Sequence, residues 1–87
     1  MKKLLNTLYI TSENKYLSLD GENVVIKEEG AELGRMPLHN LEMIVTFSRA
    51  GASPALMGKC ADNNISIVFL TPSGSFLARV EGKTKGN

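Results

Sequence analysis

The sequence predicts a mostly β fold of the α+β class, a small β-sandwich-like domain of about six to eight strands with one amphipathic helix. Most apolar residues stand in short runs rich in Val, Ile and Phe, and turn-forming residues separate these runs. A single stretch has the spacing of an amphipathic helix. The chain has 87 residues, of which 43% are apolar, so we expect one domain with a small core.

Turn chemistry divides the apolar runs into strands. Asp20-Gly21 supplies the positive φ values of a tight hairpin turn, and a second turn is expected at residues 29–32. Pro37 has no backbone N–H, which confines its strand to a sheet edge or a strand end. Strands are therefore expected over residues 3–11, 17–19, 24–26, 33–38, 41–47, 65–70 and 76–80.

The helix is expected over residues 55–64. Ser53 is a favourable N-cap, and Pro54 suits the first helical position because its φ is already helical. Asn63 and Asn64 are a plausible end, since Asn tolerates the left-handed conformation. At 100° per residue one face is apolar and carries Leu56, Met57, Cys60 and Ala61.

The net charge of +1, from ten basic and nine acidic residues, excludes a strongly basic nucleic-acid binder with a wide positive field. The distribution is uneven. Residues 1–12 carry two lysines (+2), residues 13–32 carry two lysines and six acids (−4), and residues 33–87 carry six basic and three acidic groups (+3). A polyanion would avoid the middle segment and prefer the rest, although ordinary surface solvation explains the same distribution.

The sequence contains few residues that could act in catalysis. The single histidine, His39, stands beside a turn-forming Asn40, and Cys60 lies on the apolar helix face, where a free cysteine is usually a small hydrophobe. The crowded acids of residues 28–32 do not have the spacing of a metal site. The sequence therefore predicts no catalytic residue and no metal site in this chain.

The chain is expected to be cytoplasmic, with no membrane partner. Its apolar runs are far shorter than the ~20 residues that a membrane span needs. Asn6 and Thr7 interrupt the apolar start, so no signal-peptide core forms. One cysteine excludes an intrachain disulfide.

Two places offer contacts for a nucleic acid. Arg49 stands four residues before Ser53, where the free N–H groups of a helix start could hold a phosphate; simple capping by Ser53 is the alternative. Tyr16 follows Lys15, a pair that could stack on a splayed base beside a phosphate, or Tyr16 could merely cover a sheet edge. The phenylalanines, Phe47, Phe69 and Phe76, stand in apolar runs and are expected in the core.

Four segments, residues 16–26, 33–45, 51–61 and 66–82, together resemble one family. In this order and spacing they are similar to the N-terminal β-domain of the CRISPR-associated integrase, the endonuclease of spacer acquisition, and closest to its type I, subtype C members. The resemblance covers nearly the whole chain.

The resemblance implies an N-terminal domain, residues 1–82, that forms homodimers and helps to cradle the captured DNA duplex. Residues 83–87 would begin the linker to a larger C-terminal helical domain that this chain lacks. In the family that domain holds a divalent metal (Mg or Mn) on a Glu, a His and an acidic residue and performs strand transfer. No cofactor is therefore expected in this chain, and the full complex would add the small CRISPR adaptation partner protein.

The resemblance also bears on the DNA-binding residues. Arg49 matches a position that contacts the DNA backbone in relatives, and Lys59 and Arg79 are further candidates on their charge alone. Some relatives place an aromatic wedge in the loop before the second strand; here residues 12–15 carry none, and Tyr16 is only adjacent. The candidate DNA-binding residues are thus Arg49, Lys59, Arg79, Ser53, Lys15 and Tyr16.

Two further expectations concern association. A small β domain has strand edges and apolar faces that one short helix cannot cover, which predicts a symmetric homodimer. Residues 17–26 and 33–44 are the expected contributors. The alternative function is a stand-alone β-rich protein-interaction module without a nucleic-acid role, which the near-zero net charge favours.

Overall fold

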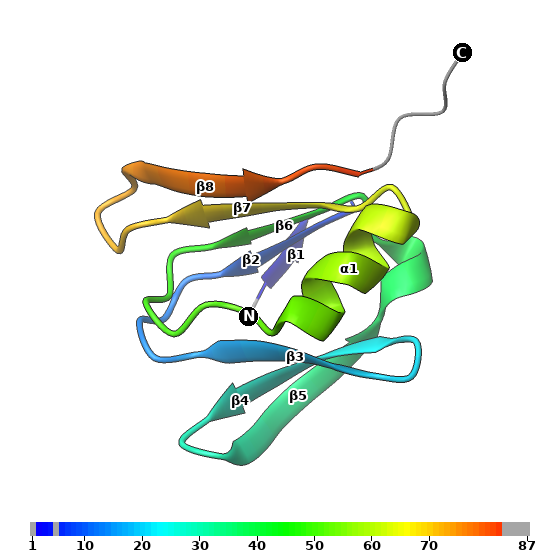
Figure 1. Cartoon of the computed structure of the whole chain (residues 1–87). Coiled ribbons are helices and arrows are strands. Elements are labelled where there is room, and N and C mark those ends of the chain that lie inside the picture. Colours follow the sequence, from blue (N-terminus) through cyan, green and yellow to red (C-terminus); the bar gives the residue numbers. More distant parts are fainter. Residues whose placement is uncertain (1, 5, 83–87) are drawn as a thin grey trace.

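The computed structural model describes residues 2–4 and 6–82, with the backbone alone for residues 2–4. Two β-sheets form two layers, and one α-helix lies at their side (Figure 1). The five-stranded sheet has the order β1 (Lys2–Leu4), β2 (Thr7–Ile10), β6 (Met43–Thr46), β7 (Ser66–Leu70) and β8 (Phe76–Val80). The three-stranded sheet has the order β3 (Tyr16–Asp20), β4 (Asn23–Glu28) and β5 (Ala31–Pro37). The predicted fold class, mostly β with one helix, is confirmed.

Local turn chemistry explains the three-stranded sheet. Gly21 has φ +61° at the β3–β4 turn, as the Asp-Gly pair predicts. At the β4–β5 turn Glu29 and Gly30 both have positive φ, 52° and 83°. Pro37 closes β5, which is an edge strand of this sheet. With these two short turns, the neighbouring strands of this sheet pair antiparallel and follow each other along the chain.

The first predicted strand, over residues 3–11, is wrong as a single strand. The structure has two antiparallel strands there, β1 and β2, with Lys2 opposite Tyr9 and Leu4 opposite Thr7. Asn6, a turn former, lies between them. Alternation of apolar and polar residues gives the period of a strand but does not show where the chain folds back.

The centre of the five-stranded sheet is parallel. β2 pairs with β6, and β6 pairs with β7, both in parallel. Parallel neighbours need long crossover connections, and here the three-stranded sheet connects β2 to β6 while α1 (Pro54–Asp62) connects β6 to β7. Since β2 and β6 run in the same direction, the loops that follow them leave the sheet side by side.

The helix begins and ends close to the predicted positions. Ser53 Oγ accepts a hydrogen bond from Leu56 N at 3.1 Å, and Pro54 is the first helical residue. Asn63 is the C-cap, and Asn64 has φ +61° in the left-handed region. The apolar face packs against β3 of one sheet and against β7 and β8 of the other.

The core lies between the two sheets and the helix. Alternate residues of β2 and β6 point into it, which accounts for the buried Leu8, Ile10, Ile44 and Thr46. The other buried residues of the core cluster are Leu17, Val24, Ile26, Leu38, Leu41, Leu56, Cys60, Ile65 and Ile67.

Two local predictions differ from the structure. The strand expected over residues 41–47 is the shorter β6, and a short 3-10 helix, η1 (Leu38–Asn40), precedes it. Phe69 packs against the core and Phe47 is half-buried, but Phe76 is 64% exposed, so its assignment to the core is wrong. Phe76 begins β8, which is an edge strand of the five-stranded sheet among the described residues.

Candidate nucleic-acid interface

The loops that follow β2 and β6, residues 11–15 and 47–53, are joined by hydrogen bonds, and we call them the loop pair. The backbone N–H of Phe47 donates to Ile10 O at 2.9 Å, and that of Arg49 donates to Glu13 O at 2.9 Å. The two parallel strands thus continue into two loops that stay paired beyond the sheet.

The second half of the loop pair attaches to the other sheet. Leu17 N donates to Gly51 O at 3.1 Å, and Ser53 N donates to Leu17 O at 2.8 Å. Ala52 forms a parallel bridge with Leu17. Gly51 has φ +79°, a conformation that L side chains rarely adopt, so glycine suits this position. Residues 47–53 therefore connect the two layers.

Ser48 lies at the centre of the loop pair and is 4% exposed. Its hydroxyl donates to Glu13 O at 2.8 Å and accepts from Lys15 N at 2.9 Å and Ala50 N at 3.1 Å. Its own N–H donates to Thr46 Oγ1 at 3.1 Å. A serine hydroxyl has one donor and two acceptor positions, and all three are used here.

Four of the six predicted DNA-binding residues belong to this region. Arg49, Ser53 and Lys15 are in the loop pair, and Tyr16 follows it as the first residue of β3. The sequence could not place these residues together, because the two loops are more than thirty positions apart in the chain.

The other two predicted residues lie elsewhere. Arg79 is on β8, across an apolar groove of about 430 Å³ from Ala50 and Gly51. Lys59 is on α1 and forms an ion pair at 2.8 Å with Glu22, in the β3–β4 turn. That turn is at the end of β3 opposite to the loop pair. The structure therefore does not gather Lys59 with the other candidates.

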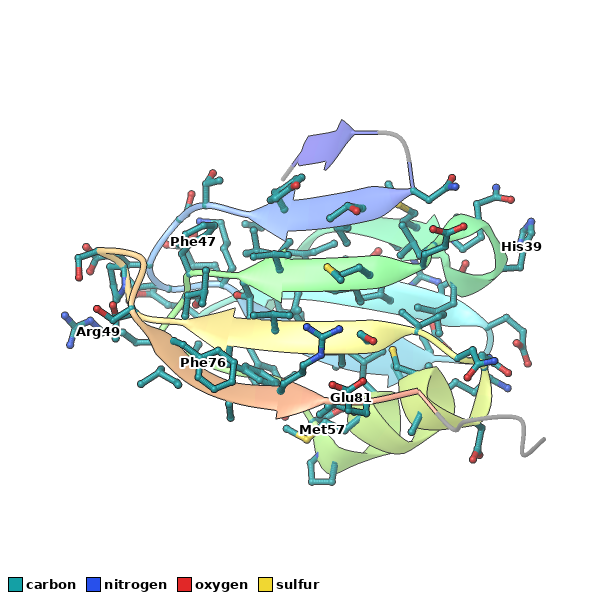
Figure 2. All side chains as sticks on the ribbon, turned by 90° about the horizontal axis from the view of Figure 1, so that it is seen from above. His39, Phe47, Arg49, Met57, Phe76 and Glu81 are labelled. Carbon is teal, nitrogen blue, oxygen red and sulfur yellow. The ribbon has the colours of Figure 1, made fainter. Side chains whose placement is uncertain are left out.

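Charge distinguishes Arg49 from the other predicted cations. Lys15 pairs with Glu28 at 2.7 Å, Lys59 with Glu22, and Arg79 with Glu81 at 2.5 Å. Arg49 is exposed, and its guanidinium has no hydrogen bond or ion pair within residues 2–4 and 6–82. Figure 2 shows its side chain pointing away from the molecule, at the end opposite to His39. Arg49 is thus the predicted cation whose charge is available to an external anion.

The neighbours of Arg49 have different roles. Ser53 uses its oxygen to cap α1, so the predicted capping is confirmed, and a phosphate contact at Ser53 stays a prediction. Tyr16 is 37% exposed on an edge strand of the three-stranded sheet. Its side chain is accessible, and whether it stacks on a base stays a prediction.

A second polar site was not predicted from the sequence. On the outer face of the three-stranded sheet, Arg35 contacts Asp20 at 3.1 Å and Glu32 at 2.7 and 2.9 Å. The hydrogen bond from Arg35 lowers the pKa of Glu32, and its bonds to Glu32 and Asp20 raise the pKa of Arg35. Lys27 lies on the same face, so two cations balance two carboxylates there, and the site offers no excess of positive charge to a polyanion.

The residues considered for catalysis are separated. His39 is exposed in η1, whereas Cys60 is fully buried in α1, and burial raises the pKa of its thiol to about 11. Within the described part of the chain, no cluster of His, Cys, Asp or Glu could hold a metal ion. None of the described helices is long and apolar enough to span a membrane.

The sequence matches the family model of the CRISPR associated protein Cas1 over residues 8–87. It is 51% identical over 87 residues to CRISPR-associated endonuclease Cas1 2 of Rhodospirillum rubrum, covering 100% of this chain and 25% of that protein. It is 46% identical to CRISPR-associated endonuclease Cas1 1 of Chlorobaculum tepidum, with the same coverage. The chain thus spans about a quarter of the length of these curated relatives.

A solved structure of a TtCas1–DNA complex has the same fold, with a TM-score of 0.71 at 16% identity, covering 99% of this chain and 33% of that chain. Such a low identity supports the fold alone, whereas the family assignment rests on the sequence match over nearly the whole chain. The family that the four segments predicted is confirmed: this chain belongs to the Cas1 family of CRISPR-associated proteins.

Proposed function

We propose that this chain is the N-terminal β-domain of the integrase of CRISPR spacer acquisition and that it dimerises and positions DNA for antiviral defence. Residues 1–82 would form this domain and residues 83–87 the start of a linker. A C-terminal helical domain would then hold the divalent metal and perform strand transfer. The relatives named endonucleases, about four times longer than this chain, support such a division.

The loop pair is the part of this domain that we propose to contact DNA. The observation that carries the proposal is the exposed guanidinium of Arg49, which has no partner in the described part of the chain, on a loop held by hydrogen bonds to its neighbour. Phosphate contacts by Arg fix the position of a duplex without reading its sequence. A solved structure of the same fold is a TtCas1–DNA complex, which supports a role in DNA binding for the family but does not bear on the choice of this loop pair.

The partners follow from the same family. A Cas6-RT-Cas1–Cas2 complex contains a chain of this fold, with a TM-score of 0.80 at 13% identity, covering 88% of this chain and 8% of that chain. We propose that the small adaptation partner of this chain is a Cas2 protein and that the complex acts in the cytoplasm. Assignment to subtype C of type I stays a prediction.

We propose that the second copy pairs along β8. Of the two ranges expected to contribute to the dimer, residues 17–26 offer little apolar surface because Leu17 and residues 24–26 are buried, and residues 33–44 include Leu33, which is 54% exposed. By contrast, Phe76 and Leu77 are 64% and 61% exposed on β8, whose outer edge is unpaired within the described residues. An apolar edge of this kind accepts another strand readily. The apolar groove beside β8 adds a surface for side chains of the second copy.

DNA binding is tested by measuring the affinity for forked duplex DNA by fluorescence anisotropy at several salt concentrations. Arg49→Ala should weaken binding and reduce the slope of log affinity against log salt by about one unit, as loss of one phosphate contact does. Lys27→Ala is the matched control, because it removes one cation from the outer face of the three-stranded sheet. Equal slopes for the wild type, Arg49→Ala and Lys27→Ala would show that Arg49 makes no phosphate contact.

The alternative function, a protein-interaction module, has one observation in its favour. Lys15, Lys59 and Arg79 are engaged in ion pairs, so among the side chains that the structure describes few cations are free for DNA. It predicts no salt-dependent affinity for DNA in the wild-type chain, and the same titration decides between the two functions.

A further inference from the structure

The hydroxyl of Ser48 connects the loop pair on both sides of Arg49. Ser48 Oγ donates a hydrogen bond to Glu13 O in the facing loop at 2.8 Å. The same oxygen accepts a hydrogen bond at 3.1 Å from the backbone N–H of Ala50, the residue that follows Arg49. Lys15 N in the facing loop donates to the same oxygen at 2.9 Å. No motif in the sequence marks this serine, because its role depends on a loop more than thirty positions away.

We propose that Ser48 is a positioning residue for DNA binding, which holds the backbone of Arg49 so that its guanidinium meets a phosphate of the duplex. The proposal rests on the proposed function of the loop pair. Ser48 itself is 4% exposed, and all three hydrogen-bonding positions of its hydroxyl are already used, so the proposal gives it no direct contact with a phosphate. It acts through Arg49, whose side chain points outward.

The geometry at Glu13 supports this role. Glu13 O accepts from Ser48 Oγ at 2.8 Å and from Arg49 N at 2.9 Å, so one carbonyl fixes both residues. A cation on a fixed backbone loses less conformational freedom on binding than one on a mobile loop, which raises affinity without any new contact.

Loss of the hydroxyl has a defined structural effect. In Ser48→Ala the N–H groups of Lys15 and Ala50 lose their acceptor, and Glu13 O loses one of its two donors. Unpaired groups of this kind favour opening of the loops to water. The sheets do not depend on these bonds, because their ladders and core involve other residues. The loop pair should therefore loosen while the domain stays folded.

A double-mutant cycle tests the proposal on this chain. The affinity for forked duplex DNA is measured for the wild type, Ser48→Ala, Arg49→Ala and the double variant. We expect Ser48→Ala to weaken binding about three- to tenfold when Arg49 is present and to have no further effect in Arg49→Ala, since coupled residues are not additive. Ile67→Val, a core change in β7, controls for general destabilisation and should leave the affinity unchanged.

Amide hydrogen exchange separates the possible outcomes. Faster exchange at Lys15, Arg49 and Ala50 in Ser48→Ala, together with the coupled loss of affinity, supports the proposal. Faster exchange with unchanged affinity, or an equal loss of affinity in both backgrounds, overturns it while the effect of Arg49→Ala still supports the proposed function. If Arg49→Ala itself binds DNA as the wild type does, the proposed contact fails, and the positioning role fails with it.

Discussion

Gly82 packs directly on the backbone of Asn64, so closely that a β-carbon at Gly82 would lie 2.6 Å from the Asn64 Cα atom. Asn64 stands just beyond the end of α1 with φ +61°. The chain that leaves β8 therefore crosses the C-terminal end of the helix with no space for a side chain. This contact holds Gly82 against the end of α1.

Gly82→Ala should destabilise the domain by about 1–3 kcal/mol, because the new methyl group meets backbone that cannot move aside easily. Thermal unfolding followed by circular dichroism measures the change. Gly58→Ala is the matched control. A β-carbon there would meet nothing within 4 Å, and Ala favours the helix by about 0.5–1 kcal/mol. A Gly82→Ala protein as stable as the wild type would show that the end of α1 yields to the methyl group.

Stability should fall between about pH 9 and pH 11 because of Cys60. Burial raises the pKa of its thiol from an ordinary value of 9.0 to about 11, so the unfolded chain ionises first. The contribution of the neutral thiol to the free energy of unfolding is complete below pH 9. It is lost as the pH rises through the pKa of Cys60 in the folded chain, and the total loss is up to about 3 kcal/mol. Urea unfolding across this range should show a smaller loss for Cys60→Ala than for the wild type. Equal losses would mean that Cys60 does not carry the effect.

Arg35→Gln should raise the pKa of Glu32 toward its ordinary value of 4.5, because the hydrogen bond from Arg35 is the main cause of the lowered pKa. The lowered pKa of Glu32 stabilises the folded chain at pH values above the pKa that Glu32 has in the unfolded chain. This contribution disappears as the pH falls through the pKa of Glu32 in the folded chain. An NMR titration of the carboxyl carbon measures the pKa. Lys59 pairs with Glu22 and not with Glu32, so the control variant Lys59→Gln should leave the titration of Glu32 unchanged.

Replacing Phe76 and Leu77 together by Ser should convert the proposed dimer into a monomer, because these side chains are the exposed apolar groups of the β8 edge. Sedimentation equilibrium near 100 μM, which detects association of roughly −5.5 kcal/mol, measures the change. Leu33→Ser is the control, since Leu33 is 54% exposed on β5, in the range 33–44 expected from the sequence. Dissociation by Leu33→Ser alone would move the interface to β5.

Features determined by neighbouring residues were predicted from the sequence. The Asp20-Gly21 turn and the start of α1 at Ser53 and Pro54 are confirmed, because φ preferences and capping act within a few residues. The apolar face of the helix is confirmed for the same reason, with Leu56 and Cys60 buried.

Features that depend on distant parts of the chain were missed. The parallel pairing of β2, β6 and β7 depends on crossovers, and the exposure of Phe76 depends on β8 being an edge. Arg49 was a candidate from its position before the helix. Ser48, which shares the acceptor Glu13 O with the backbone of Arg49, was not a candidate, because its hydrogen bonds depend on the facing loop. Ion pairing of Lys15 with Glu28 also could not be inferred, because it connects residues that pack only in the folded state.

The crossover between β2 and β6 also has a consequence for the order of folding. The three-stranded sheet consists of two consecutive hairpins, which close short loops and can form early. Pairing of β2 with β6 must wait until that whole sheet has been made and placed, because it lies between them in the chain. The loop pair needs both strands as well as β3, so it forms only after the segment that contains the three-stranded sheet has been made. During synthesis, therefore, every partner in the hydrogen bonds that join the loop pair is present once residue 53 has been made, while α1, β7 and β8 still follow in the chain.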